Sequence, residues 1–183
     1  MNRKPRIHSS HRHYHVTVYC NPSSNRVLAE EDFFIYLNLL GRVKQKHQFT
    51  LFHYGLLPDR VHLFLKPSSR IDLSKTMHLI NWSFAKSFNR RRNLRGHFWL
   101  ERYRSLAVNR GDESLETMRE IDRGPVRNGL VKDPAEWAWS GYSALTRGTS
   151  DELLTFHPDY LDLGITAAER QEEYRRWVRE KMS

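Results

Sequence analysis

Two polar residues, Arg60 and His62, are separated by one residue in a predicted strand, which is the spacing of a metal-binding pair. Because strand side chains alternate between the two faces of a sheet, Val61 and Leu63 are expected on the opposite face. Histidines at both polar positions would place two imidazoles side by side on a rigid strand. Arg60 cannot bind a cation, because its guanidinium stays protonated and offers only donors. The pattern therefore indicates a metal-binding pair in which one ligand has been replaced.

The composition favours a nucleic-acid-binding protein. The chain has 183 residues, 12% aromatic residues and a formal net charge of +9, which fits one well-filled domain with a surface that attracts polyanions. No run approaches the roughly 18 apolar residues of a membrane-spanning helix, and no apolar stretch follows the N-terminal charges as in a signal peptide. The single cysteine, Cys20, excludes an internal disulfide. We expect a cytoplasmic protein with no membrane partner.

The periodicity of the first 110 residues predicts the order β-α-β-β-α-β. Strands are predicted at 14–19, 49–56, 60–66 and 102–108, and helices at 29–47 and from Asp72, a candidate N-cap, towards residue 88. In the second helix, apolar residues recur at helical spacing from Leu73 to Phe88. This order predicts an α+β, ferredoxin-like or RRM-like fold, in which two helices pack on a four-stranded antiparallel sheet.

The remaining residues predict a helical extension. A third helix is expected at 112–122, ended by Gly124 and Pro125, followed by an aromatic-rich helical segment at 134–145 and a terminal helix at 166–182, where Glu172 is expected to pair with Arg176. We predict a basic N-terminal arm at 1–13, a main domain at 14–145, and a loop and terminal helix at 146–183 that pack on the same domain.

Several short stretches occur in an order that is more specific than any one of them. They are residues 3–8 (RKPRIH), 14–17 (YHVT), 54–63 (YGLLPDRVHL), 88–91 (FNRR), 96–99 (GHFW), 102–105 (RYRS), 125–131 (PVRNGLV), 133–134 (DP) and 139–142 (WSGY). Together they resemble the IS200-like single-tyrosine transposases, and most closely the REP-associated tyrosine transposases. The resemblance covers nearly the whole chain and assigns residues 14–145 to the DNA-binding domain of this family.

The resemblance implies a chemistry from which this chain departs. Such enzymes cut single-stranded DNA beside an imperfect hairpin, using a His-hydrophobe-His pair that binds Mg²⁺ or Mn²⁺ and a helical tyrosine that attacks the scissile phosphate. Arg60 stands where the family has a histidine, whereas His62 is retained as the one family metal ligand. Glu120 occupies the tyrosine position, and Gly124 that of an asparagine that completes the metal site.

These replacements predict that no catalytic residue and no metal cofactor remain. A carboxylate at position 120 would repel the phosphate, and a mixed anhydride formed by its attack would be unstable. The positions of Arg60 and Glu120 around one scissile phosphate, with their opposite charges, suggest an ion pair between them; the alternative is that each is a solvated residue of a drifted site. His53 could join His62 in a metal site, but a hydrogen-bonded sheet histidine is the preferred interpretation.

The basic residues are the expected binding surface, because cationic side chains that contact phosphates give affinity and fix register. The predicted nucleic-acid-binding residues are Arg3, Lys4, Arg6, Arg12, Arg90, Arg91, Arg92, Arg95, His97, Arg102, Arg104 and Arg127.

The preferred interpretation is a DNA-binding protein that recognises a hairpin or a palindromic repeat, does not cleave it, and acts by occupancy like a repressor. One alternative is a nickase that requires Mg²⁺ or Mn²⁺ and uses another nucleophile. Tyr103 could in principle take this role, but packing in the core or against DNA is its preferred interpretation. Another is a protein that binds RNA hairpins. Whether the protein forms a homodimer is left open.

Overall fold

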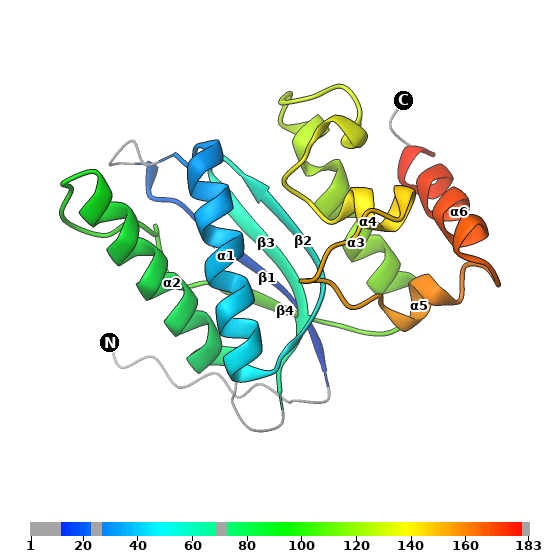
Figure 1. Ribbon diagram of the computed structural model, residues 1–183, viewed down its shortest axis with the longest axis horizontal. Coiled ribbons are helices and arrows are strands. Elements are labelled where there is room, and N and C mark those ends of the chain that lie inside the picture. Colours follow the sequence, from blue (N-terminus) through cyan, green and yellow to red (C-terminus); the bar gives the residue numbers. More distant parts are fainter. Residues whose placement is uncertain (1–11, 23–26, 69–72, 181–183) are drawn as a thin grey trace.

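The computed structural model in Figure 1 describes residues 12–22, 27–68 and 73–180, so Arg3, Lys4, Arg6 and Asp72 lie outside the described residues. Its four strands form one antiparallel sheet in the spatial order β2-β3-β1-β4. The strands are β1 (His13–Tyr19), β2 (Thr50–Leu57), β3 (Arg60–Lys66) and β4 (Arg104–Val108). The predicted α+β fold with a four-stranded antiparallel sheet is confirmed.

One face of the sheet is covered by α1 (Glu30–His47) and α2 (Leu73–Arg91), which lie side by side in Figure 1. The core between them and the sheet contains Leu40 and Phe84, together with Val61 and Leu63, which lie on the predicted face of β3. The acidic side chains in the first turn of α1 and the basic side chains in its last turn interact favourably with its helix dipole.

Helices α3 (Asp112–Arg127), α4 (Tyr142–Arg147), α5 (Pro158–Leu161) and α6 (Ala167–Arg179) gather at the right of Figure 1. A second core joins them to the other face of the sheet, where Phe64 of β3 packs in one cluster with Ile121 of α3 and Tyr174 of α6. Tyr174 is fully buried, so α6 contributes a side chain to this core as well as docking on the domain.

The prediction that Gly124 and Pro125 end the third helix is wrong, because α3 continues to Arg127. Proline removes the hydrogen bond to the carbonyl of Ile121 and crowds that carbonyl, but its fixed φ is helical, so the chain can remain helical after it. The carbonyl of Gly124 accepts hydrogen bonds from the backbone and the side chain of Asn128, and the carbonyl of Pro125 accepts one from Leu130.

The prediction of one helical segment at 134–145 is also only partly right. The chain forms a 3₁₀ turn, η2 (Pro134–Glu136), then an extended stretch, and only then α4. In the extended stretch the carbonyl of Trp139 accepts from Leu56, and the amide of Gly141 donates to Tyr54, both on the edge strand β2. Pairing with the edge of the sheet satisfies backbone groups of both this stretch and β2.

The terminal helix forms as predicted, with Thr166 as its N-cap, but its ion pairs differ. Glu172 pairs with Arg175 and Arg176 pairs with Glu173, so the predicted Glu172–Arg176 pair is wrong. Within the described residues, no helix has the length and apolar character needed to span a membrane.

Candidate nucleic-acid interface

The strand register places the candidate residues in rows across the sheet face opposite α1 and α2, beside the part that α3 covers; we call the uncovered part of this face the open sheet face. Thr17 of β1 lies directly opposite His62 of β3 on one side and Arg104 of β4 on the other. In the next row, Tyr19 of β1 lies opposite Arg60 of β3. Residues that are directly opposite share a face, so β1 contributes His15, Thr17 and Tyr19 to the surface that also carries Arg60 and His62.

His62 is tied into the sheet by two neighbours on β1. Its Nδ1 lies 3.1 Å from Nε2 of His15 and 3.2 Å from Oγ1 of Thr17. Burial, with a smaller contribution from His15 and Arg60, lowers the pKa of His62 to about 3. Burial also lowers the pKa of His15 to about 4. Both imidazoles are therefore neutral near pH 7, and one nitrogen of His62 is already engaged.

Helix α3 reaches the sheet because Gly55 has no side chain. Gly55 lies opposite His62, and a Cβ at this position would be 2.7 Å from Cγ2 of Ile121. The close approach places Glu120 and Gly124 beside the strand that carries Arg60 and His62. All four positions line one small cavity of ≈ 200 Å³, so the structure brings together the residues that the family resemblance assigned to one site.

The predicted ion pair between Arg60 and Glu120 is wrong. Glu120 pairs instead with Arg127, which follows it by two helical turns on the same face of α3. The hydrogen bonds from Arg127 hold the pKa of Glu120 below its usual value. Arg60 donates to Asp59 Oδ1 at 3.0 Å and to Asn128 Oδ1 at 2.7 Å. Glu120 is thus paired within its own helix, and Arg60 is held by the residue before it and by Asn128, which follows α3.

The residues of this cavity do not fit a divalent metal ion. A guanidinium that donates to Asn128 stands beside the single histidine that the family motif retains, and the carboxylate of Glu120 is neutralised by Arg127. Gly124 offers no side-chain ligand, and its carbonyl accepts from Asn128. In the described part of the chain, no group of three or more His, Cys, Asp or Glu side chains is arranged to hold a metal ion.

The open sheet face carries an aromatic ring that the sequence interpretation missed. The guanidinium carbon of Arg60 lies 5.7 Å from the ring centroid of Tyr19, and that of Arg104 lies 5.3 Å from the same centroid. Because both guanidiniums lie over this partly exposed ring, the three side chains form a cationic patch that can contact phosphates. The signal was present, since Tyr19 shares its alternation with His15 and Thr17, and the β-α-β-β-α-β order places the first strand beside the third.

Two residues of the predicted arginine cluster have a structural role. Arg91 and Arg92 donate to the buried carboxylate of Asp32 at 2.8 Å and so join α2 to the start of α1. Burial alone would raise the pKa of Asp32, but its bonds to Arg92, the Ala29 amide and Arg91 lower it. Both guanidiniums would have to leave this carboxylate, wholly or in part, to contact a phosphate.

The other predicted contacts are spread over the surface. Arg12, Arg90 and Arg95 are exposed. Arg104 donates to Glu101 at 2.7 Å, and Arg102 donates to Ser74 and lies over the ring of Tyr103. His97 and Arg102 line a groove beside α2, away from the open sheet face. The structure therefore separates the predicted residues into more than one surface, and their contacts with nucleic acid stay predictions.

Two alternative catalytic residues are buried. His53 is fully buried, and its Nε2 lies 2.8 Å from Oδ1 of Asp122, whose Oδ2 accepts from the hydroxyl of Tyr174 at 2.7 Å. This chain of contacts links β2, α3 and α6, as expected for a hydrogen-bonded sheet histidine. Tyr103 is 3% exposed, with its hydroxyl 3.0 Å from Ser74, which does not suit a nucleophile that must reach DNA.

Comparison with known proteins identifies the family. The family model for IS200-like transposases matches residues 8–121, a segment that includes Arg60, His62 and Glu120. The chain belongs to the IS200-like transposase family. Within this family, the structure is similar to that of a REP-associated tyrosine transposase bound to a REP hairpin, with a TM-score of 0.69 and 18% identity, over 86% of this chain and 93% of that chain. At this identity the similarity shows a shared fold.

A second solved structure, described as a transposase from Deinococcus radiodurans, covers 60% of this IS200-like chain and 88% of its own, with 18% identity and a TM-score of 0.45. A TM-score this low carries no argument. The comparison with curated proteins found no match. The family and fold expected from the ordered motifs are thus confirmed.

Proposed function

We propose that this IS200-like protein binds DNA at a hairpin or palindromic repeat, does not cleave it, and acts by occupancy as a repressor does. The observation that carries the proposal is the pairing of Glu120 with Arg127 in the cavity where the family resemblance expects a nucleophilic tyrosine. A carboxylate held by a guanidinium cannot act as a hydroxyl nucleophile, whereas the cations around the cavity still suit a phosphate backbone.

The open sheet face supports binding without chemistry. Tyr19, Arg60 and Arg104 form a partly exposed platform beside the cavity, and the formal net charge of the chain is +9. Phosphate contacts from such a surface need no metal ion, and they weaken with salt because bound counterions are released. The REP hairpin in the similar solved structure makes hairpin DNA the first ligand to test.

The decisive experiment is to incubate the protein with a labelled DNA hairpin in Mn²⁺ and, separately, in EDTA. We expect the same affinity in both buffers, no strand cleavage and no covalent adduct on a denaturing gel. Cleavage or an adduct that forms only with Mn²⁺ would overturn the proposal in favour of the nickase alternative. An RNA hairpin of the same sequence, used as competitor, tests the RNA-binding alternative, which requires RNA to displace the DNA at an equal or lower concentration.

A pair of charge variants tests whether the open sheet face makes the contact. Arg104→Gln removes a cation next to Tyr19, whereas Arg42→Gln removes one from the exposed surface of α1, which covers the opposite face of the sheet. We expect only Arg104→Gln to weaken binding, and to reduce the slope of log K against log salt by about 1. Equal affinities for the two variants would refute this placement of the interface.

A repressor role is tested separately, in a reporter strain with the selected hairpin placed in the promoter region. The protein should lower expression, and the Arg104→Gln variant should lower it less. Gel filtration with and without DNA determines whether the protein forms a homodimer.

A further inference from the structure

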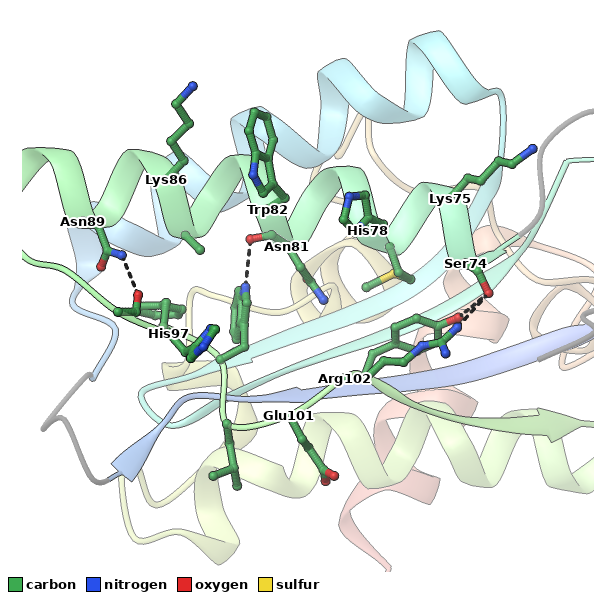
Figure 2. A pocket seen from close by; sticks show the side chains of 17 residues that line it. Ser74, Lys75, His78, Asn81, Trp82, Lys86, Asn89, His97, Glu101 and Arg102 are labelled. Atoms are coloured by element: carbon green, nitrogen blue, oxygen red, sulfur yellow. Dashed lines mark hydrogen bonds between the residues drawn. The ribbon is translucent and has the colours of Figure 1, made fainter. Parts of the chain in front are cut away.

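A groove of ≈ 980 Å³ runs along the outer side of α2, and we call it the α2 groove. In Figure 2, α2 forms one wall and the segment from Gly96 to Tyr103 forms the other. Trp82 on the first wall is 53% exposed, and Leu100 on the second is 50% exposed. Each wall of the groove thus carries one large exposed apolar side chain, and apolar grooves rimmed by polar residues are common ligand sites.

The charge of the α2 groove is almost entirely positive. Its lining includes Lys75, Lys86 and Arg102, and Glu101 is the one acidic side chain among the described residues that line it. Glu101 is already engaged by Arg104 on the other side of the segment, at 2.7 Å. An anionic ligand in the groove would therefore meet cations whose charge this acid does not offset.

Trp82 and Lys86 form the most specific feature of the α2 groove. The ammonium of Lys86 lies 4.9 Å from the centroid of the indole, one helical turn away on α2. Figure 2 shows both side chains extending outward from the helix, with the ammonium over one face of the indole of Trp82, a residue that remains 53% exposed. This combination suits a nucleobase that stacks on the ring while its phosphate approaches the lysine.

Two side-chain amides below the floor of the groove have an oxygen without a partner among the described residues, although the amide nitrogen of Asn89 donates to Gly96. Oδ1 of Asn81 and Oδ1 of Asn89 are buried and have no hydrogen-bond partner within the described residues. In Figure 2 the amide of Asn81 extends from α2 towards the opposite wall, between Trp82 and Arg102. Side-chain amides are suited to the edges of bases, which present donors and acceptors together. Trp82 thus offers an exposed ring for the face of a base, and the edge of the base would reach the two buried amide oxygens only if the side chains of Asn81 and Asn89 turned towards it.

We propose that the α2 groove binds a single-stranded nucleic-acid segment, with one base stacked on Trp82 and its backbone held by Lys75, Lys86 and Arg102. The inference rests on the proposed DNA-binding function and adds a second contact, away from the open sheet face, that takes the unpaired flank of a hairpin. An acidic peptide would satisfy the cations, but it offers no flat heteroaromatic ring for the indole and the amides.

The test measures fluorescence anisotropy with three labelled DNAs: an unstructured single strand, a hairpin with paired ends, and the same hairpin with an unpaired flank. Trp82→Leu keeps an apolar side chain without a ring, and Trp82→Phe keeps a ring. We expect Trp82→Leu to weaken binding of the single strand and of the flanked hairpin by about 5- to 150-fold, from the measured range for base stacking. Trp82→Phe should lose much less, and neither variant should change binding of the hairpin with paired ends.

Matched controls lie on α1. Phe34→Leu removes a ring that is 62% exposed, and Lys46→Gln removes an exposed lysine; neither residue lines the α2 groove. Lys86→Gln should lower the slope of log K against log salt for the single strand by about 0.7, whereas Lys46→Gln should leave it unchanged. Equal losses for Trp82→Leu and Phe34→Leu, or for Trp82→Leu and Trp82→Phe, would overturn the proposal.

The three DNAs also separate this inference from the function on which it rests. Binding of both hairpins with no dependence on Trp82 would refute the α2 groove as a site and leave the DNA-binding function intact. Binding of the single strand that depends on Trp82, without binding of either hairpin, would support the groove and refute hairpin recognition. A failure of the wild-type protein to bind any of the three would refute both.

Discussion

Restoring the family's residues should give the protein the ability to form a covalent adduct with DNA. The change is the triple variant Arg60→His, Glu120→Tyr and Gly124→Asn. It supplies the hydroxyl nucleophile and the side-chain ligands that the present cavity lacks. Because these groups act as one unit, we expect the triple variant to nick a labelled hairpin in Mn²⁺ and each single reversion to do nothing.

The structure indicates that the triple variant will fold. The Glu120–Arg127 pair is half-exposed, so its loss costs about 0 to 1 kcal/mol. Loss of the hydrogen bond from Arg60 to Asn128 costs about 0.5 to 1.5 kcal/mol. A Cβ at Gly124 would lie 3.4 Å from Cδ1 of Leu57, an ordinary contact, and asparagine in place of glycine inside a helix gains a few tenths of a kcal/mol. The sum, at most about 2.5 kcal/mol, is below the roughly 5 to 15 kcal/mol of a typical domain.

The assay is a denaturing gel with a hairpin labelled on both sides of the expected cut, so that the released strand and the strand attached to protein are both seen. Thermal unfolding by circular dichroism is measured on the same samples. A folded triple variant that binds the hairpin but forms no adduct would refute the assignment of these three positions to one site. An adduct from any single reversion would refute the claim that they act together.

Three further changes test other parts of the structure. Burial lowers the pKa of His62 to about 3 and that of His157 to about 4. In the unfolded chain the histidine pKa values are near 6.5, so the unfolded state takes up protons first as the pH falls. The free energy of unfolding, measured in urea, should therefore decrease between pH 7 and pH 5, and a constant value would contradict the burial of these histidines. Asp32→Ala removes the buried acceptor of two arginines and should lower the free energy of unfolding by about 2 to 4 kcal/mol. The control Arg90→Ala, on the exposed surface, should change it by less than about 0.5 kcal/mol. Similar values for the two variants would show that the pairs with Asp32 are unimportant for stability. Glu120→Gln should tighten hairpin binding by up to about 1 kcal/mol, or fivefold, in anisotropy titrations at low salt, and unchanged affinity would place the phosphates elsewhere.

The sequence predicts the central fold well because its elements carry their own signals. The alternation from Val61 to Leu65 and the helical spacing from Leu73 to Phe88 each reflect burial on one side, and burial is what the structure shows. The errors lie where a partner far along the chain decides the conformation. Trp139 is extended because the edge of β2 offers backbone partners, and Pro125 is helical because Asn128 and Leu130 complete the last turn. Neither partner is visible in local periodicity.

For the candidate site, the sequence predicts which residues lie close together better than it predicts which of them form ion pairs. The family resemblance places Arg60 and Glu120 around one cavity, and the structure does so. Which charge pairs with which depends on side-chain reach within a few ångströms, and there Arg127, on the same helical face as Glu120, is favoured over a residue from another element. The α2 groove was missed for a different reason: Trp82 and Lys86 lie on the outer side of a helix whose inner side carries the stronger periodic signal.

The pairings in the cavity also bear on how DNA would be bound there. Arg127 is held by Glu120 and Arg60 by Asp59, while His62 is neutral, so the cavity and its immediate partners carry no net charge from these side chains. A phosphate that approaches either arginine competes with the carboxylate that this arginine already holds. Because the Glu120–Arg127 pair is half-exposed, this exchange costs little, and the net charge of +9 favours the phosphate. In the proposed complex Glu120 would compete with the DNA backbone for Arg127, so neutralising Glu120 should strengthen binding instead of weakening it.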